Sequence, residues 1–174
     1  LIGPNGAGKT TVFNLLTKVY QPTRGTILLN GKDTHGMSIA QANRAGIART
    51  FQNIRLFNNL SVEDNVKIGL HNQVRSPMWD GVLRLPKFWK QEKLAHESAM
   101  ELLSIFGMED LANHEAGSLP YGAQRRLEIV RALATNPSLL LLDEPAAGMN
   151  PSETAELMEN IRKIRDTFQI AVML

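Results

Sequence analysis

The sequence predicts a three-layer α/β domain built on a mainly parallel β-sheet, with an antiparallel β edge and an inserted helical block. Three observations predict this class. Strand-like and helix-like segments alternate along the chain, a glycine-rich loop opens a helix at residues 3–10, and an apolar run at residues 139–142 ends in two carboxylates. Short apolar strands that alternate with amphipathic helices are typical of a parallel sheet covered on both faces.

The composition is that of an ordinary globular domain, with 43% hydrophobic and 21% charged residues in 174. The formal net charge of +2 is small, and the basic residues are scattered among acids, so nucleic-acid binding is not expected. The absence of cysteine excludes disulfides and thiolate metal sites and suits a reducing compartment. Because no apolar run approaches the roughly 18 residues that cross a bilayer, we expect a soluble chain.

The glycine-rich loop is the most informative stretch. Residues 3–10 match the phosphate-loop pattern G-x-x-x-x-G-K-[ST] at every fixed position, which a merely flexible turn would seldom do. Its glycines can take positive φ, so successive N–H groups can turn inward around an anion. We expect Lys9 to bridge the β- and γ-phosphates of a nucleotide and Thr10 to ligate Mg²⁺. The predicted phosphate-binding residues are Gly3, Pro4, Asn5, Gly6, Ala7, Gly8, Lys9, Thr10 and Thr11.

Both ends of the chain fall within expected strands. Only Leu1 and Ile2 precede the phosphate loop, which should follow a buried strand. The chain stops in the apolar run 170–174, with no turn residue after it. We therefore expect a domain that is truncated at both ends.

The first part of the chain alternates helix and strand patterns. Apolar spacing predicts a helix over residues 11–17 and a strand over 26–29, which the hairpin turn Asn30-Gly31 follows. Ser38 and Gln41 form a capping box for a short helix that ends at Gly46.

A glutamine stands at the end of the next predicted strand, residues 47–51. In a phosphate-loop protein, Gln52 at this place can reach Mg²⁺ or orient the attacking water. From the residues alone a surface amide is the commoner role. Both interpretations stay open at this point.

Residues 61–134 show helix patterns and no strand pattern, so this block is interpreted as an inserted helical subdomain. Ser61 and Asp64 cap a helix through Leu70. Residues 72–90 form an insertion of low periodicity that holds both tryptophans, Trp79 and Trp89, either exposed at a protein interface or packed on the neighbouring helices. The domain would then be a single unit, residues 1–174, with its core in residues 1–60 and 135–174.

Two longer helices are predicted in this block. One covers residues 91–106 and is closed by Gly107. The other covers residues 121–134, and Gly122 at its start leaves backbone N–H groups that can receive a phosphate, although few such starts do. Its polar residues are expected largely off the apolar face: Arg125, Arg126, Glu128 and Arg131.

The second informative stretch is the strand at residues 139–142, which ends in Asp143 and Glu144. Two carboxylates at the mouth of a buried strand are costly unless a metal or solvent meets them. In a phosphate-loop protein Asp143 suits a Mg²⁺ ligand, and Glu144 suits a base that polarises the attacking water. A solvated strand end is the alternative. Asn150, Pro151 and Glu153 then form a helix start that leads to the last strand.

Taken together, these motifs resemble the ATP-binding cassette (ABC) ATPases in order and spacing. The resemblance rests on Gly3 to Thr10, Phe51-Gln52, the run 118–126, and Leu139 to Pro145, and it covers the whole chain. Closer phrases at residues 48–53, 119–122 and 146–151 are similar to the ATPase subunit of branched-chain amino acid importers.

The resemblance implies a P-loop NTPase (RecA-like) core that binds ATP and Mg²⁺. Gln52 matches a glutamine that touches Mg²⁺ and senses the membrane partner, Asp143 matches the metal-holding aspartate, and Glu144 matches the catalytic base. Gly122 matches a signature glycine that faces the γ-phosphate of a second ABC subunit, identical or different, in a head-to-tail dimer. The implied partners are transmembrane permease subunits at the cytoplasmic face of the membrane, with no nucleic acid.

Some family residues differ or lie outside the chain. The usual signature is Leu-Ser-Gly-Gly-Gln, but Pro120, Tyr121 and Ala123 replace its serine, first glycine and glutamine, and Asn150 stands where an aspartate is usual. Losing the serine's hydrogen bond costs about 0.5–1.5 kcal/mol, which weakens the dimer without abolishing it. The family's adenine-stacking aromatic and switch histidine would lie beyond the two ends, so we expect these 174 residues to bind nucleotide but turn over poorly.

Two rival functions are less well supported by the residues. A non-transport ABC ATPase acting on nucleic acid or the ribosome would need a coiled-coil insertion or a basic face, and residues 72–90 offer neither. A GTPase would carry the guanine motif Asn-Lys-x-Asp, which does not occur in the sequence.

Overall fold

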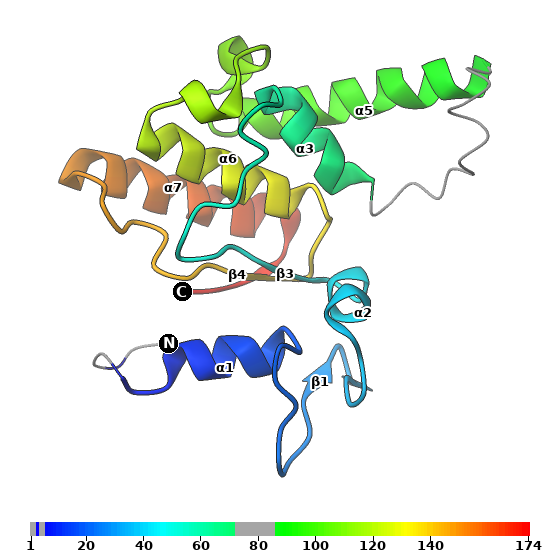
Figure 1. Ribbon diagram of the computed structural model, residues 1–174, viewed down its shortest axis with the longest axis vertical. Coiled ribbons are helices and arrows are strands. Elements are labelled where there is room, and N and C mark those ends of the chain that lie inside the picture. The colour runs from blue at the N-terminus through cyan, green and yellow to red at the C-terminus, as the bar shows by residue number, and fades with distance from the viewer. Residues whose placement is uncertain (1–2, 4–5, 72–85) are drawn as a thin grey trace.

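A parallel sheet with helices on both faces forms the centre of the molecule, as seen in the computed structural model (Figure 1), which describes residues 3, 6–71 and 86–174. The helices of the described residues are α1 (Lys9–Leu16), α2 (Ile39–Arg44), α3 (Val62–Leu70), α5 (Pro86–Ser104), α6 (Tyr121–Leu133) and α7 (Pro151–Phe168), with 3₁₀ turns at Glu109–Leu111 and Ala116–Ser118. The strands are β1 (Leu28–Leu29), β2 (Lys32–Asp33), β3 (Ile47–Arg49), β4 (Leu139–Leu141) and β5 (Ala171–Met173).

The central sheet has the strand order β3-β4-β5, and both pairs of neighbours are parallel. Leu140 of β4 stands opposite Ala48 on one side and Val172 on the other. Helix α7 provides the crossover from β4 to β5, as parallel neighbours require. The separate β1–β2 hairpin is antiparallel, and Asn30 and Gly31 both take positive φ in its turn, as the sequence predicts. The predicted α/β class with an antiparallel β edge is therefore confirmed.

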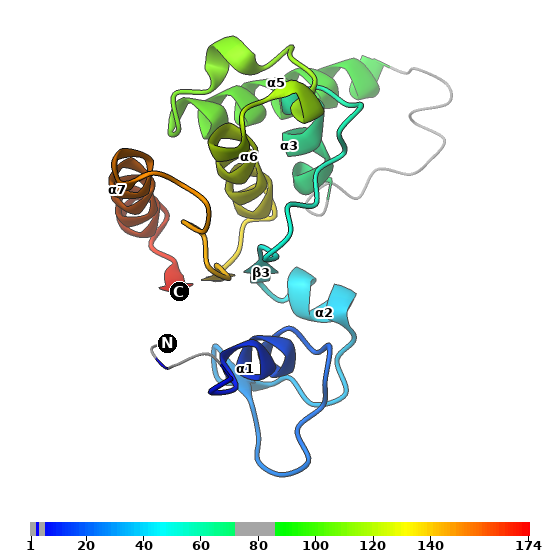
Figure 2. The same ribbon diagram turned by 60° about the vertical axis from the view of Figure 1, so that its left-hand side comes forward.

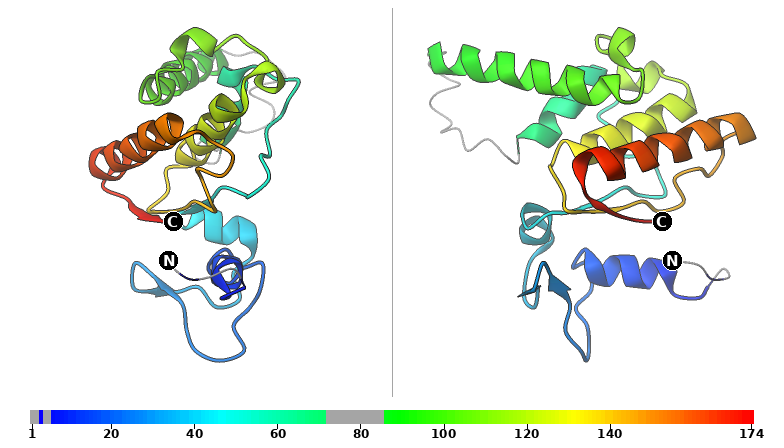
Figure 3. Two further views of the ribbon diagram at one scale, coloured as in Figure 1. Left: turned by 90° about the vertical axis from the view of Figure 1, so that its left-hand side faces the viewer. Right: turned by 180° about the vertical axis from the view of Figure 1, so that it is seen from behind.

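The helices cover the two faces of the sheet unequally. Helix α1 and the β1–β2 hairpin lie on one side, whereas α6 and α7 lie side by side on the other (Figure 2). The α1 side holds a small core of Phe13, Ala42, Ile47 and Leu141. Helices α3 and α5 lie beyond α6, away from the sheet (Figure 3), and one large apolar core runs through α3, α5, α6, β4 and α7. The division into a core and a helical subdomain stays a prediction.

Three predicted helix starts have the expected caps. The Ser38 hydroxyl accepts from the Gln41 N–H in a complete capping box, and the Ser61 hydroxyl accepts from the Asp64 N–H. At α7, the Asn150 side chain and Glu153 form a second capping box around Pro151. Asn150 therefore caps the helix at a position where the resemblance to ABC ATPases implies aspartate.

Several element boundaries differ from the prediction. Strand β3 ends at Arg49 instead of residue 51, because side chains of α6 rather than a neighbouring strand bind the Phe51 backbone. Helix α5 begins at Pro86, inside the stretch predicted to lack periodicity, since proline is well tolerated in the first turn of a helix. It ends at Ser104, with Gly107 at positive φ in the turn beyond. Trp89 is 60% exposed, whereas Trp79 and the rest of residues 72–85 lie outside the described residues.

Candidate active site

The described residues of the phosphate loop, Gly3 and residues 6–8, lead into the start of α1. Gly6 and Gly8 both have φ near +83°, a conformation that side chains with a Cβ rarely adopt, and Gly8 is the N-cap of the helix. The Lys9 ammonium donates to the Gly3 carbonyl at 2.5 Å, so the lysine folds back onto the first residue of the motif. Within the described residues no side chain caps the N-terminus of α1, which leaves its first N–H groups for an anion. Pro4 and Asn5 lie outside the described residues.

Arg49, at the end of β3, joins α1 to the end of β4. Its Nη1 donates to Asn14 Oδ1 at 2.6 Å, and its Nη2 donates to Asp143 Oδ2 at 3.0 Å. Asn14 follows Thr10 by four residues in α1, so the two side chains share one face of the helix. Thr10 and Asp143 therefore lie on the same side of the sheet. The packing of Phe13 against Leu141 in the smaller core agrees with this placement.

The two predicted catalytic residues, Gln52 and Glu144, lie close in sequence to Arg49 and Asp143, respectively. Gln52 is exposed and directly follows Phe51, whose ring lies 5.4 Å from the Arg49 guanidinium carbon. Glu144 is exposed and directly follows Asp143. Its φ of +46° is in the left-handed region, which is uncommon for a residue with a side chain and is frequent at functional sites. The ends of β3 and β4 thus present Gln52, Asp143 and Glu144 at one edge of the sheet.

Gly122 lies in the first turn of α6, which has Pro120 as its N-cap and no capping side chain. It is packed against α7, since a Cβ built on Gly122 would be 3.3 Å from Glu153 Oε1. The ring of the half-exposed Tyr121 covers Gly148. The start of α6 therefore packs against the start of α7 and the segment before it.

Sequence reasoning missed three residues of this region. Arg125 and Glu128 were predicted largely off the apolar face of α6, and that prediction was wrong, because their side chains are 0% and 2% exposed. They can be buried because they form hydrogen bonds with each other and with the surrounding backbone. Their spacing of three residues on one helix face is a signal for such a pair. For Arg49, the sequence pattern indicates only a strand position.

The side chains at this edge suit Mg²⁺ bound together with a nucleotide. Magnesium commonly takes one or two carboxylates, several waters and the phosphate oxygens of the substrate. Asp143 supplies one carboxylate and Thr10 one hydroxyl. Among the described residues no group of three or more acidic, histidine or cysteine side chains can hold a metal by itself. A metal here would therefore depend on phosphate oxygens and water.

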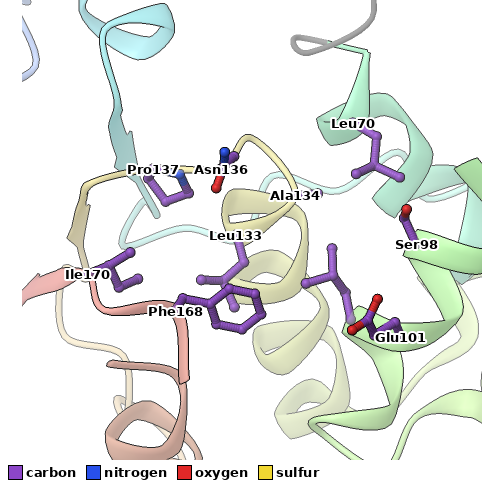
Figure 4. Close-up of a pocket in the computed structure, with 10 residues that line it drawn as sticks. Leu70, Ser98, Glu101, Leu133, Ala134, Asn136, Pro137, Phe168 and Ile170 are labelled. Atoms are coloured by element: carbon purple, nitrogen blue, oxygen red, sulfur yellow. The ribbon is translucent and has the colours of Figure 1, made fainter. Parts of the chain in front are cut away.

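A separate hollow lies between α5, α6 and the segment that leads into β5 (Figure 4). Leu133, Phe168 and Ile170 line it, with Glu101 near one end. The lining found in the described part of the chain contains no lysine or arginine. This hollow does not suit a phosphate, so the candidate site remains at the phosphate loop.

The fold and the arrangement of this edge define a phosphate-loop nucleotide-binding domain. The chain belongs to the ABC transporter family, which matches residues 1–147. No helix within the described residues has both the length and the apolar character that crossing a membrane requires.

Two relatives are similar to the chain over its whole length. It is 46% identical over 174 residues to the high-affinity branched-chain amino acid transport ATP-binding protein LivG of Escherichia coli (strain K12), covering 100% of this chain and 68% of LivG. It is 45% identical to BraF of Pseudomonas aeruginosa, a protein of the same description, with the same coverage.

Solved ATP-binding cassettes share the fold. The ADP conformation of MJ1267 has a TM-score of 0.80 at 29% identity, covering 98% of this chain and 66% of that one. The dimeric post-hydrolysis state of MJ0796, bound to ADP and Pi, has a TM-score of 0.78 at 26% identity, covering 98% and 70%. The predicted family and fold are thereby confirmed.

Proposed function

We propose that this chain is the ATP-binding and ATP-hydrolysing subunit of an importer for branched-chain amino acids. The observation that supports this proposal best is the pair of hydrogen bonds made by Arg49. They hold the helix of the phosphate loop and the Asp143 carboxylate on one side of the sheet. The solute follows from similarity to LivG and BraF, whose descriptions name branched-chain amino acid transport.

The residues divide into three tasks. The loop N–H groups and the Lys9 ammonium hold the phosphates, because an uncapped helix start and a cation both attract anions. Thr10, Asp143 and Gln52 would hold Mg²⁺, which would neutralise phosphate charge when it is bound. Glu144 accepts a proton from the attacking water, and Gln52 orients that water.

A second ABC subunit completes the site in this proposal. The N–H groups at the start of α6, including that of Gly122, would meet the γ-phosphate held by the other subunit. The absence of a capping side chain on α6 and the half-exposed Tyr121 beside it support such a surface. The solved MJ0796 cassette, which is dimeric with ADP and Pi bound, supports the pairing of two such domains. The other partners are permease subunits, which would place the protein at the cytoplasmic face of the membrane.

Transport by the reconstituted importer tests the proposal. The full-length subunit is assembled with its permease subunits in vesicles, and uptake of labelled leucine, isoleucine and valine is measured with ATP supplied on the ATPase side. Uptake should require hydrolysable ATP and should be lost with Lys9→Ala. Fructose serves as the control solute. Uptake that is independent of ATP, or specific for the sugar, would contradict the proposed function.

A further inference from the structure

Arg125 has an unusually complete set of partners. Its side chain is fully buried at 0% exposure. A guanidinium carries five N–H groups, and the structure gives Arg125 five hydrogen bonds: to the carbonyls of Phe51, Asp143, Glu144 and Pro145 and to the Glu128 carboxylate. Burying an arginine is costly unless it is paired and hydrogen-bonded throughout, and that condition is met here.

On one side, the Arg125–Glu128 pair holds the residue that precedes Gln52. Arg125 Nη1 donates to the Phe51 carbonyl at 2.5 Å, and the Phe51 N–H donates to Glu128 Oε1 at 3.3 Å. The other oxygen of Glu128 accepts from Arg125 at 2.7 Å. Both polar backbone groups of Phe51 are therefore bound to one rigid pair on α6, which takes the place of a neighbouring strand.

On the other side, Arg125 holds three successive carbonyls at the end of β4. Its Nη2 donates to the Asp143 carbonyl at 2.6 Å and to the Glu144 carbonyl at 3.1 Å, and its Nε donates to the Pro145 carbonyl at 3.3 Å. Successive carbonyls in an extended strand point to opposite sides. Here they converge on one guanidinium, and Glu144 has the positive φ of +46° that permits it.

We infer that Arg125, held by Glu128, is a positioning residue that sets the backbone of Gln52 and of Glu144 together. One side chain on α6 binds the backbone immediately before Gln52 and the backbone of Glu144 itself. A shift of α6 therefore moves both residues. This inference rests on the proposed ATPase function, because it assigns Arg125 to the geometry of hydrolysis rather than to nucleotide binding.

The test compares Arg125→Lys and Glu128→Gln with a matched control, Leu127→Ala, in the full-length subunit. Leu127 is fully buried between them in sequence, so its truncation destabilises the same helix by cavity formation without removing the five hydrogen bonds. Lysine keeps the charge but has only three donors, so Arg125→Lys cannot replace all five bonds. The measurements are kcat, the ATP dissociation constant, the unfolding midpoint and hydrogen exchange of residues 51–53 and 143–147.

Arg125→Lys should lower kcat at least tenfold and change ATP affinity less than threefold. It should also speed hydrogen exchange in both segments at once. Leu127→Ala should lower the unfolding midpoint but keep the kcat of the folded protein. An equal loss of kcat in Leu127→Ala and Arg125→Lys, or faster exchange in only one segment, would overturn the inference. A wild-type subunit that bound no ATP would instead refute the proposed function.

Discussion

Two arginine–carboxylate pairs lie on either side of Phe51, and they differ in burial and in what they hold. Arg49 and Asp143 join β3, β4 and α1, and their side chains are 9% and 17% exposed. Arg125 and Glu128 lie on α6 at 0% and 2%. Arg49 meets the face of the Phe51 ring, whereas Arg125 and Glu128 bind its backbone.

The difference in burial means that the Arg49–Asp143 pair can adjust, whereas the Arg125–Glu128 pair is fixed. Arg49 contacts a single oxygen of Asp143, and a carboxylate has a second oxygen that can meet a metal. The partly exposed pair can therefore adjust when a cation arrives. The buried pair cannot lose a partner without leaving a charge in the core, so we interpret it as the permanent frame of the site.

The largest effect on turnover is expected from substitution of Glu144, whose backbone is held by the Arg125–Glu128 pair. Glu144→Gln removes the proposed base while keeping the size of the side chain and the backbone turn. General-base catalysis contributes about 10²–10⁴-fold, so kcat of the full-length subunit should fall by that factor. ATP binding should be kept, and the ATP-bound dimer should accumulate in size-exclusion chromatography. A variant with normal turnover would remove Glu144 from its role.

The buried pair should be the next most sensitive. Arg125→Met leaves the Glu128 carboxylate buried without its cation, which costs about 3–5 kcal/mol of the unfolding free energy. The double variant Arg125→Met with Glu128→Leu replaces the pair by apolar groups and should recover much of this stability. Its ATPase activity should stay low because Phe51 and Glu144 lose their backbone partners. Urea unfolding and turnover measured on the same samples separate the two effects, and recovery of both would contradict a positioning role.

Breaking the partly exposed Arg49–Asp143 pair should lower the unfolding free energy by less. Arg49→Met removes two hydrogen bonds made by a charged group, to Asn14 and Asp143; such bonds are worth about 1.5–3 kcal/mol each, and the partial exposure of this pair lowers the cost. The loss should appear in urea unfolding. Added Mg-ATP should recover part of it, because a bound cation would meet the freed Asp143 carboxylate. A loss as large as that of Arg125→Met, with no recovery by Mg-ATP, would erase the distinction between the two pairs.

The smallest effect on stability is expected for Glu63, which is ion-paired with Lys67 and His96 on the outer helices α3 and α5. Burial of Glu63 opposes its ionisation, but the hydrogen bonds and charges of Lys67 and His96 outweigh burial and lower the pKa of Glu63 below its usual 4.5. This stabilisation is present above pH 4.5 and is lost as the pH falls through the lowered pKa.

The acid dependence of this pair can be checked with Glu63→Gln. At neutral pH the variant should be less stable than the wild type by about 0.5 kcal/mol, as is usual for pairs near the surface. The difference in melting temperature should shrink as the pH falls from 4.5 through the lowered pKa, below which the wild-type carboxyl is also neutral. A difference that stays constant between neutral and acid pH would show that the ion pair is not its cause.

Much of the fold could be predicted from local signals. The capping residues at 38, 61 and 150 and the Asn30-Gly31 turn act within a few residues, so their geometry follows from sequence alone. The apolar run of β4 predicted a strand buried in a parallel sheet because both of its faces had to be covered. The phosphate loop predicted the start of α1 for the same local reason.

The rest depends on contacts between distant segments. Periodicity placed Arg125 off the apolar face of α6, but the carbonyls of residues 51 and 143–145 create a polar position inside the core. Arg49 bonds Asn14 from 35 residues away and Asp143 from 94 residues away in the sequence, and no local pattern encodes those separations. The roles of the predicted site residues stay predictions until nucleotide is bound.

The central claim is that the phosphate loop and the end of β4 meet around one metal-bound nucleotide. A crystal structure of full-length Glu144→Gln with Mn²⁺ and ATP tests it directly, because manganese marks its own position by anomalous scattering. The account predicts one manganese peak about 2–2.2 Å from the Thr10 hydroxyl, joined to Asp143 directly or through one water, with the γ-phosphate beside Lys9. Nucleotide bound away from the loop, or manganese without contact to both Thr10 and Asp143, would contradict the account.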